Sequence, residues 1–212
     1  MSFLWEQPVE ITGSAHNPLL EVTYAQGRLK LSTGNAVYSF EDNYVAFREG
    51  LRLAEIEKLT IKDCLILGYG MGSIPVILEK LFKLTPSYTG VELDETIVEL
   101  ARKYYHERSE HINFQVEDAY EWVRSENGVY DLICIDLFID NEVPEKFEQE
   151  EFLLNVKGLL KEGGMLLFNR MALGHEQLEK ANHFYNNSFS KLFDGSRMLR
   201  VRNNRLLCWQ ND

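Results

Sequence analysis

Cysteine is scarce in this sequence, and its three copies are scattered. Cys64, Cys134 and Cys208 each lie alone inside an apolar run, so their spacing favours neither a disulfide scaffold nor a zinc site. The five histidines show no metal-ligand spacing either. The sequence therefore predicts no metal site, and it gives little support to a catalytic thiol.

Positive charge is also in short supply. The chain has 22 Lys and Arg against 33 Asp and Glu, a net charge of -11, and no basic patch that would attract a phosphate backbone. No apolar run approaches the roughly 18–20 residues that span a bilayer, and the first residues do not read as a signal peptide. We expect a cytoplasmic protein with no nucleic-acid or membrane partner, and 212 residues suit one domain of ordinary size.

The first forty or so residues read as short β segments. Residues 20–24 and 28–31 flank a turn that contains Gly27, and 36–40 alternate in the manner of a third strand. Apolar residues at helical spacing then predict a helix from about Asn43 to Lys58. We therefore divide the chain into an N-terminal β-hairpin segment, residues 1–42, and a second domain, residues 43–212.

From residue 62 onward, strands alternate with helices. This alternation predicts a doubly wound α/β domain with a mostly parallel sheet and right-handed crossovers. Ser73 and Asp94 are the expected N-caps of the first two helices, and Gly163 and Gly164 the expected end of the fourth. The predicted strands are 64–67, 88–92, 112–116, 131–136 and 165–168, and the predicted helices are 74–82, 95–105, 119–124, 150–160 and 176–189.

The last predicted strands break this alternation. Residues 197–201 and 205–209 are separated by a gap too short for a crossover helix, so they must form an antiparallel hairpin. The sheet then has seven strands and ends in a hairpin, which distinguishes it from the six-stranded parallel dinucleotide fold.

A glycine-rich loop follows the first parallel strand. Gly68, Gly70 and Gly72 allow a sharp turn and a close approach of the backbone to a ligand at the start of the next helix. Glu92 ends the second strand some twenty residues later, where a carboxylate can accept both hydroxyls of a ribose. Taken alone, the loop can be a tight turn and Glu92 a solvated strand end, but together they favour nucleoside binding.

Two further acids follow strands three and four. Asp118 can accept the exocyclic amine of an adenine while the backbone at Ala119 meets a ring nitrogen, or it can cap the short helix that begins at Ala119. Asp136 ends the fourth strand at the same edge of the sheet, and we expect it to act as the catalytic base or as an anchor for the acceptor.

These stretches resemble the class I S-adenosylmethionine-dependent methyltransferase fold and, more narrowly, the spermidine synthase-like family. The resemblance implies a Rossmann-like fold, S-adenosylmethionine or its decarboxylated form as the donor, a small and possibly amine-containing acceptor, and a homodimer. It is carried by residues 64–73, 91–94, 117–119 and 130–138, with weaker matches at 27–29 and 44–49. The donor-binding residues that it implies are Gly68, Tyr69, Gly70, Met71, Gly72, Glu92, Leu93, Asp118, Ala119 and Asp136.

Two departures from that family bear on the reaction. Aminopropyltransferases carry an Asp in the glycine loop where Met71 stands, and a second acid three residues after the one that ends strand four, whereas here an acid returns one residue late, at Asp140. We therefore expect a methyltransferase, with aminopropyl transfer as the alternative. A non-catalytic nucleoside-binding interaction module remains open, and an NAD-dependent oxidoreductase is disfavoured because Ser73 replaces the third glycine of the dinucleotide motif.

Overall fold

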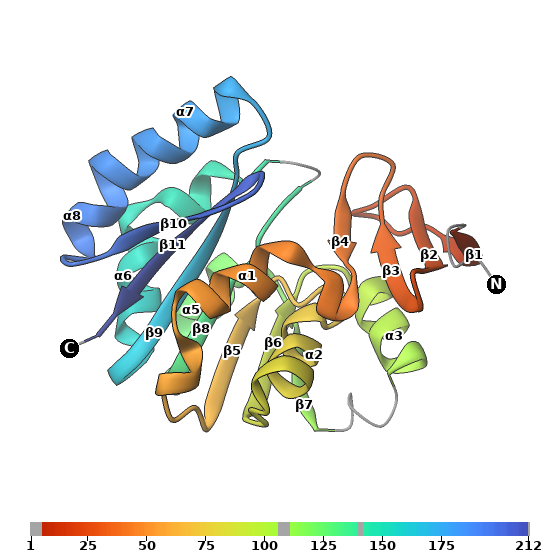
Figure 1. The fold of residues 1–212 in the computed structure, drawn as a ribbon, viewed down its shortest axis with the longest axis horizontal. Helices are drawn as coiled ribbons and strands as arrows, with labels where there is room; N and C mark the ends of the chain where they lie inside the picture. Colours follow the sequence, from red (N-terminus) through yellow and green to blue (C-terminus); the bar gives the residue numbers. More distant parts are fainter. Residues whose placement is uncertain (1–5, 106–110, 140–141, 212) are drawn as a thin grey trace.

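The computed structural model describes residues 6–105, 111–139 and 142–211. A seven-stranded sheet forms the centre of the molecule, with helices on both faces, and a smaller four-stranded sheet lies at one end (Figure 1). The predicted fold class, a doubly wound and mostly parallel α/β sheet that ends in an antiparallel hairpin, is confirmed.

The strand order of the central sheet creates a crevice. The chain runs from β5 outward through β6 and β7, then returns to the other side of β5 to form β8 and β9, and neighbouring strands among these five are parallel. A change of direction of this kind opens a ligand-binding crevice at the carboxyl ends of the strands. The order across the sheet is β10 (Arg197–Val201), β11 (Asn204–Gln210), β9 (Leu160–Met171), β8 (Tyr130–Ile135), β5 (Asp63–Leu67), β6 (Ser87–Glu92), β7 (Ile112–Val116).

The central strands β5 and β8 are buried on both faces, as their nearly continuous apolar sequences require. In β5, Cys64 and Ile66 join one core cluster with α1, α2 and α3, while Leu65 and Leu67 join another with α5, α6 and α7. Among the helices in the described ranges, none is long and apolar enough to cross a membrane. The helices are α1 (Val45–Leu53), α2 (Ser73–Ile77), α3 (Glu95–Tyr104), α5 (Ala119–Ser125), α6 (Glu150–Gly158), α7 (His175–Phe184) and α8 (Ser190–Leu192), with shorter turns at η1 (Glu41–Asn43), η2 (Ile56–Lys58), η3 (Leu78–Phe82), η4 (Glu145–Glu148) and η5 (Tyr185–Phe189).

Two helix predictions need correction. The helix expected from Asn43 to Lys58 is divided, because Glu55 takes a left-handed conformation, φ 57°, after which Ile56 is fully buried. Ser73 does not cap α2: Gly72 is the N-cap, and the Ser73 hydroxyl instead accepts the Phe40 N–H at 2.8 Å and lies 2.8 Å from the Ser39 hydroxyl. Both differences arise because contacts with the rest of the molecule outweigh the local helical preference.

Gly163 and Gly164 lie inside β9 and do not end the preceding helix, as the sequence had suggested. Their backbone groups pair with Asn211, whose N–H donates to the Gly164 carbonyl at 2.9 Å, so a segment near the end of the chain extends the strand. By contrast, Asp94 caps α3 as expected, accepting the Thr96 N–H at 3.1 Å.

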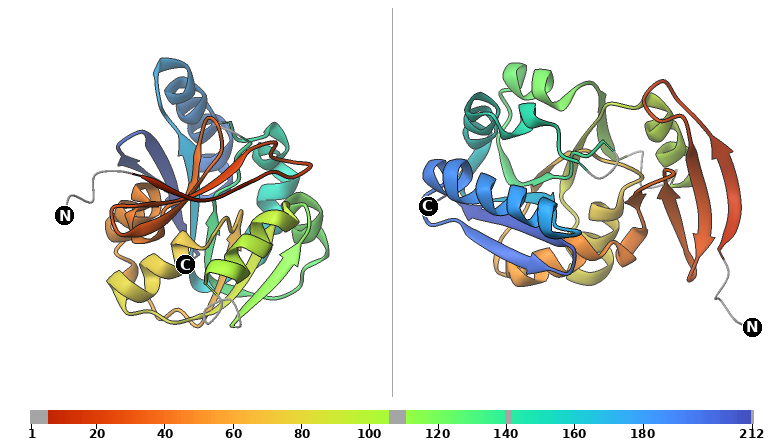
Figure 2. Two further views of the ribbon diagram at one scale, coloured as in Figure 1. Left: turned by 90° about the vertical axis from the view of Figure 1, so that its right-hand side faces the viewer. Right: turned by 90° about the horizontal axis from the view of Figure 1, so that it is seen from above.

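The N-terminal segment forms an antiparallel sheet that projects as a layer at one end of the molecule (Figure 2). Its order is β1 (Gln7–Thr12), β2 (Leu20–Ala25), β3 (Arg28–Ser32), β4 (Val37–Ser39). The last three strands were expected from the sequence, whereas β1 was missed. This strand pairs with β2 alone and is mostly exposed, so it has no clear burial pattern. The division at residue 42 stays a prediction.

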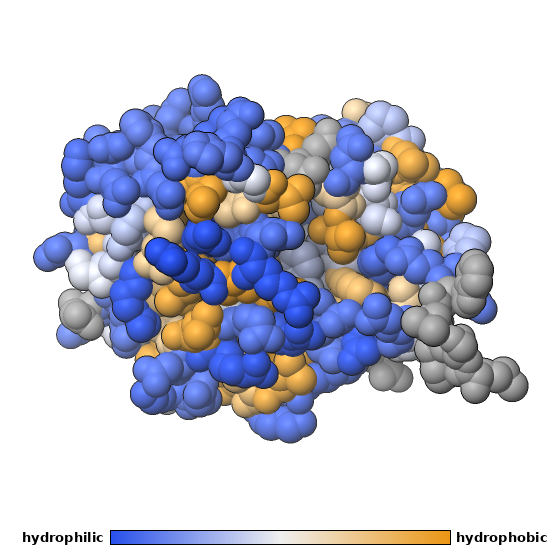
Figure 3. All heavy atoms as spheres, turned by 45° about the horizontal axis from the view of Figure 1, so that its top comes forward, coloured by the Kyte–Doolittle hydropathy of each residue, from blue (hydrophilic) through white to orange (hydrophobic). Residues whose placement is uncertain are grey.

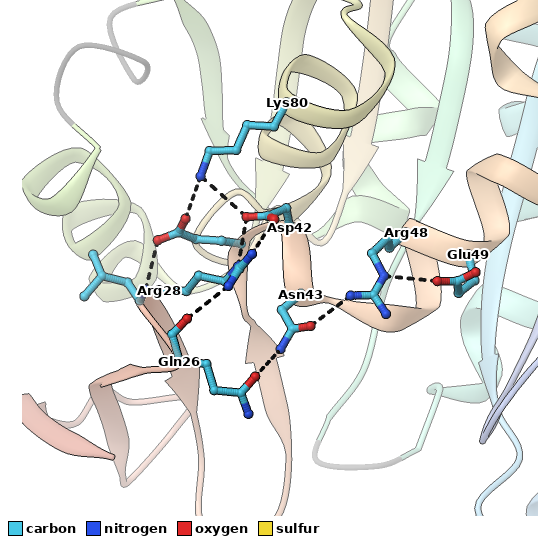
Figure 4. Close-up of polar contacts among 9 residues, drawn as sticks. Gln26, Arg28, Asp42, Asn43, Arg48, Glu49 and Lys80 are labelled. Carbon is cyan, nitrogen blue, oxygen red and sulfur yellow. Dashed lines mark hydrogen bonds and ion pairs between the residues drawn. The ribbon is translucent and has the colours of Figure 1, made fainter. Parts of the chain in front are cut away.

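A polar network ties the β2–β3 hairpin to the start of α1 (Figure 4). Arg28 donates two hydrogen bonds to the Asp42 carboxylate, of 3.0 and 2.8 Å. Lys80, which lies on η3, donates to the Glu41 carboxylate at 3.0 Å. The Arg28 guanidinium holds the pKa of Asp42 at about 2. Asn43 bonds to both Gln26 and Arg48, so the network extends to the residue that directly precedes Tyr44.

We expect Arg28→Ala to lower the free energy of unfolding by about 1–2 kcal/mol at pH 7, because the bidentate pair is half-buried and charge-assisted. Since the folded-state pKa of Asp42 lies below its ordinary 3.8, this contribution is complete above about pH 4 and disappears as the pH falls toward 2. Urea unfolding at pH 7 and at low pH measures both effects. Arg52→Ala, which removes an exposed pair within α1, is the matched control and should cost less than about 0.5 kcal/mol. If both variants lose the same free energy of unfolding, the Arg28–Asp42 pair does not stabilise the fold more than an exposed ion pair does.

Candidate functional site

A cleft of about 520 Å³ lies at the carboxyl ends of the parallel strands, between the central sheet and the N-terminal sheet. The glycine loop, the ends of β6, β8 and β9, and the start of α1 all contribute to its walls. Of the residues predicted to bind the donor, the cleft brings together Gly68, Gly70, Glu92, Leu93, Asp118, Ala119 and Asp136.

The backbone of the glycine loop requires glycine. Gly68, Gly70 and Gly72 have φ of 83°, 56° and 90°, values that L side chains rarely adopt. A Cβ at residue 68 would overlap the Asp136 carbonyl, and one at residue 70 would lie 3.1 Å from the Tyr38 carbonyl oxygen. Bare backbone at Gly68 and Gly70 therefore lets the loop pack closely against Asp136 and Tyr38.

The side chains of Tyr69 and Met71 do not face the cleft. They are 5% and 1% exposed, and both belong to the core on the α1–α3 side of the sheet. The Tyr69 ring meets Phe114 edge to face at 4.9 Å and covers Gly90, where a Cβ would lie 2.6 Å from the ring. Gly72 does not line the cleft either, and a contact of residues 69, 71 and 72 with a donor stays a prediction.

Glu92 lies at the end of β6, with its carboxylate directed at the loop. Its Oε2 accepts the Gly70 N–H at 2.9 Å and its Oε1 accepts the Asp94 N–H at 3.2 Å. Burial raises the pKa of Glu92. The Leu93 backbone N–H also bonds to this carboxylate. A carboxylate has about four acceptor sites, so Glu92 can accept a further hydroxyl donor while the loop holds it in place.

The N-terminal sheet lies along one side of the cleft, and contacts with Asp94 hold it there. Asn17 donates to Asp94 Oδ2 at 2.7 Å, Ser14 donates to the same oxygen, and the Tyr38 hydroxyl donates to Asn17 Oδ1 at 3.0 Å. Sequence reasoning missed Asn17 and Tyr38, because nothing in their local sequence indicates that the N-terminal sheet folds against α3.

Both carboxylate oxygens of Asp118 have partners within the protein. One oxygen caps α5 by accepting the Tyr120 N–H at 2.9 Å, and the other is ion-paired with Lys146. An adenine amine at this position would share the carboxylate with Lys146. The structure confirms the cap, and adenine binding by Asp118 stays a prediction.

Asp136, at the end of β8, is bound by side chains from other elements. Asn169 on β9 donates to its Oδ1 at 2.9 Å, and the hydroxyl of Tyr44, the residue before α1, also bonds to its carboxylate. Asn204 on β11 donates to Asn169 Oδ1 at 2.9 Å, which fixes the orientation of that amide. Burial raises the pKa of Asp136 to about 7, and the negative charge of Glu92 adds to the effect.

Sequence reasoning missed Tyr44, Asn169 and Asn204 as members of the site. The usable signal was Asn169, a polar residue within the apolar run that forms β9 and fully buried in the structure. Tyr44 read as one more apolar position of a helix. Phe138 lines the cleft, while Asp140 lies outside the described residues.

The strand order, the glycine loop after β5 and the acid that ends β6 define the class of S-adenosylmethionine-dependent methyltransferase-like folds. Within that class, residues 52–197 match the spermine/spermidine synthase domain, and the chain belongs to this family. This confirms the resemblance seen in the sequence.

Individual relatives point the same way. The chain is 31% identical over 107 residues to a probable polyamine aminopropyl transferase of Bifidobacterium longum (strain NCC 2705), covering 50% of this chain and 24% of the relative. It is 31% identical over 109 residues to a polyamine aminopropyltransferase of Vibrio vulnificus (strain CMCP6), covering 50% and 36%. The chain thus matches less than two fifths of the length of these relatives.

Solved structures share the fold. Spermidine synthase from Thermotoga maritima superposes with a TM-score of 0.74 at 17% identity, covering 97% of this chain and 73% of that one. Human methyltransferase-like protein 13, in complex with SAH, superposes with a TM-score of 0.64 at 18% identity, covering 79% and 82%. At such identities the likeness concerns the fold alone.

Replacing Asp136 by Asn should stabilise the protein at pH 8. The folded-state pKa of about 7 lies above the ordinary 3.8, so the ionised carboxylate destabilises the fold, increasingly as the pH rises from about 4 through 7. We expect Asp136→Asn to gain about 1–3 kcal/mol at pH 8, an advantage that shrinks toward pH 4. Denaturant unfolding across this range measures the difference. If the variant is less stable than the wild type at pH 8, the ionised Asp136 carboxylate does not destabilise the fold.

Proposed function

We propose that this chain transfers an aminopropyl group from decarboxylated S-adenosylmethionine to an amine. Its family membership and the names of its curated relatives support aminopropyl transfer better than the methyltransferase that the sequence analysis preferred. The finer assignment rests on the charge of the cleft.

The described lining of the cleft is rich in carboxylates and poor in cations. Within the described ranges its one Lys or Arg side chain is Lys146, which is already paired with Asp118. A donor that keeps its α-carboxylate would find no free cationic side chain there. Decarboxylation leaves a sulfonium and an ammonium group, and both are complementary to an acidic cleft. This is the observation that carries the proposal. The carboxylates concerned are Glu92, Asp94, Glu117, Asp118 and Asp136.

The chemistry is an in-line displacement. The amine nitrogen of the acceptor attacks the carbon of the aminopropyl group that is bonded to sulfur, the carbon–sulfur bond breaks, and its electron pair returns to sulfur, giving 5′-methylthioadenosine. The new secondary ammonium then gives up a proton. Asp136, which lines the cleft, is the group proposed to accept this proton, since its pKa of about 7 suits a group that accepts protons near neutral pH. Asn169 and Tyr44 hold its carboxylate in place.

The nucleoside would occupy the end of the cleft nearest β6 and β7. Gly70 and Glu92 would hold the ribose, and Ala119 with Asp118 would meet the adenine. Met71 offers no carboxylate to the donor's amine, because it is both apolar and buried. In this proposal the acidic character of the cleft as a whole, with Asp136 at its centre, selects the cation.

Calorimetry that ranks the donors tests the proposal. We expect decarboxylated S-adenosylmethionine to bind about tenfold or more tightly than S-adenosylmethionine, because only the latter brings an unpaired carboxylate. Incubation with an amine acceptor should then release 5′-methylthioadenosine. Tighter binding of S-adenosylmethionine, with S-adenosylhomocysteine as the product, would overturn the proposal in favour of methyl transfer.

Glu92→Ala should weaken the binding of 5′-methylthioadenosine by about 1–3 kcal/mol, since the ribose loses a hydrogen-bond acceptor. Titration calorimetry measures this change. Glu95→Ala, at an exposed position in the first turn of α3, is the matched control for the loss of one negative charge. If both variants bind the nucleoside as the wild type does, the ribose lies elsewhere.

A further inference from the structure

The β10–β11 hairpin carries an excess of positive charge in an otherwise acidic protein. Residues 195–211 contain four arginines and no Asp or Glu, whereas the whole chain has a net charge of -11. The four are Arg197, Arg200, Arg202 and Arg205. In Figure 3 the most hydrophilic side chains, in dark blue, gather near the middle of the face, in the region of the hairpin and α1. The sequence analysis found no basic patch, because these arginines are separated by other residues and become neighbours only when the strands pair.

Two of these arginines lie opposite each other across the hairpin. Arg200 pairs with Arg205 in the antiparallel register of β10 and β11, and both follow the alternation that places Leu207 on the α7 side of the sheet. Like charges directly opposite one another destabilise a strand pair. Burial and the positive charge of Arg200 lower the pKa of the Arg205 guanidinium. The hairpin is therefore less stable than it would be with an uncharged residue at either position.

Within the part of the chain that the structure describes, no carboxylate is ion-paired with an arginine of this hairpin. The hydrogen bonds of Arg205 go to backbone carbonyls, with Asn204 at 2.8 Å, and Arg197 lies 3.9 Å from the Cys208 sulfur. One carboxylate from outside the described residues would offset only one of the hairpin's four charges. The excess of positive charge therefore does not depend on those residues.

Arg170 on β9 extends the row of arginines to a third strand. It lies opposite Arg205 in the pairing of β9 with β11, and its charge is neutralised by Glu148. Arg170 is 5% exposed, and its Nε has no hydrogen-bond partner among the described residues. Buried polar groups normally have such a partner. One donor at the inner end of the row is thus unused.

Protection of the sheet edge explains only part of this arrangement. β10 is the outermost strand, and charged side chains on an edge strand prevent its pairing with another chain. This role accounts for Arg197 and Arg200. It does not account for Arg205, which lies on the second strand, is half-buried and faces a like charge.

We propose that the Arg200–Arg205 pair, with Arg202 in the turn beyond it, binds a small anion that carries two or three linked phosphates. Neighbouring strands lie about 4.8 Å apart, so such an anion can contact guanidinium groups on both strands at once. The planar guanidinium also binds two phosphate oxygens together. A long polyanion would extend beyond the hairpin onto a protein of net charge -11, which repels it. These arginines do not line the cleft, so the inference does not depend on the proposed reaction.

Calorimetry with sodium tripolyphosphate, at low salt and without divalent cations, tests the inference. We expect tripolyphosphate to bind about tenfold or more tightly than orthophosphate, because only the longer anion can contact both strands. Arg205→Gln should weaken the binding of tripolyphosphate by about tenfold or more, since it removes a charge-assisted donor. Arg124→Gln, which removes an exposed arginine on α5, is the matched control and should bind as the wild type does. Equal affinities for the two anions, or an unchanged affinity of Arg205→Gln, would overturn the inference.

Thermal unfolding separates ligand binding from a purely structural role of the arginines. An anion that binds only the folded protein raises its melting temperature. We expect tripolyphosphate to raise the melting temperature of the wild type and of Arg124→Gln, but not that of Arg205→Gln. Without the anion, Arg205→Gln should unfold at the same temperature as the wild type or above it, because a like-charge pair is gone. If tripolyphosphate does not raise the melting temperature of the wild type, the arginines serve the sheet alone and the inference fails.

Two further ligands identify the source of the phosphates. ATP carries a triphosphate on a nucleoside, and the loss of its binding in Arg205→Gln would assign that binding to the hairpin. Tighter binding of ATP than of tripolyphosphate at this site would support the inference with a nucleotide as the source, and the reverse order would support it with a free oligophosphate. A short single-stranded RNA that binds through Arg205 more tightly than tripolyphosphate would make the hairpin a nucleic-acid surface and refute the proposal.

Discussion

The buried carboxylate at the end of β8 is the feature on which the rest of the site depends. A charge removed from water must be compensated by donors, and Asp136 receives them from Asn169 and Tyr44, two residues distant in sequence. Those donors are in place only because β9 lies next to β8 and α1, which Tyr44 directly precedes, packs against the sheet. Burial still raises the pKa to about 7, so the group exchanges its proton near neutrality. The buried carboxylate therefore lowers the stability of the fold when it is ionised, and it provides the cleft with a group that can accept a proton near neutral pH.

The N-terminal sheet is a wall of the cleft as well as an appendage. Its β4 strand brings the Tyr38 carbonyl against Gly70, and its first loop binds Asp94 through Asn17. The Arg28–Asp42 network fixes the hairpin to the residues just before Tyr44, and so connects the outer sheet with Asp136. The cleft at the end of the central sheet is thus completed by a segment that precedes that sheet in the chain.

Family membership and local chemistry answer different questions. The spermine/spermidine synthase domain match concerns the fold and the kind of donor. Which groups react is decided by a few side chains, because functional sites vary on a shared fold. Here Met71 is buried at a position where members of the resembling family carry an acid. The identity of the donor is therefore the most informative property to measure.

The sequence by itself determined the alternation of strands and helices, the terminal hairpin, the glycine loop, the cap at Asp94 and the positions of Glu92 and Asp136, since all of these follow from local periodicity or from residues next to a strand end. The tertiary structure decided what local patterns do not encode. It placed Tyr69 and Met71 in the core, extended β9 through pairing with Asn211, and brought Asn169 beside Asp136. Each of these outcomes depends on a partner far away in the chain, and contacts between distant segments exist only once the sheet has assembled.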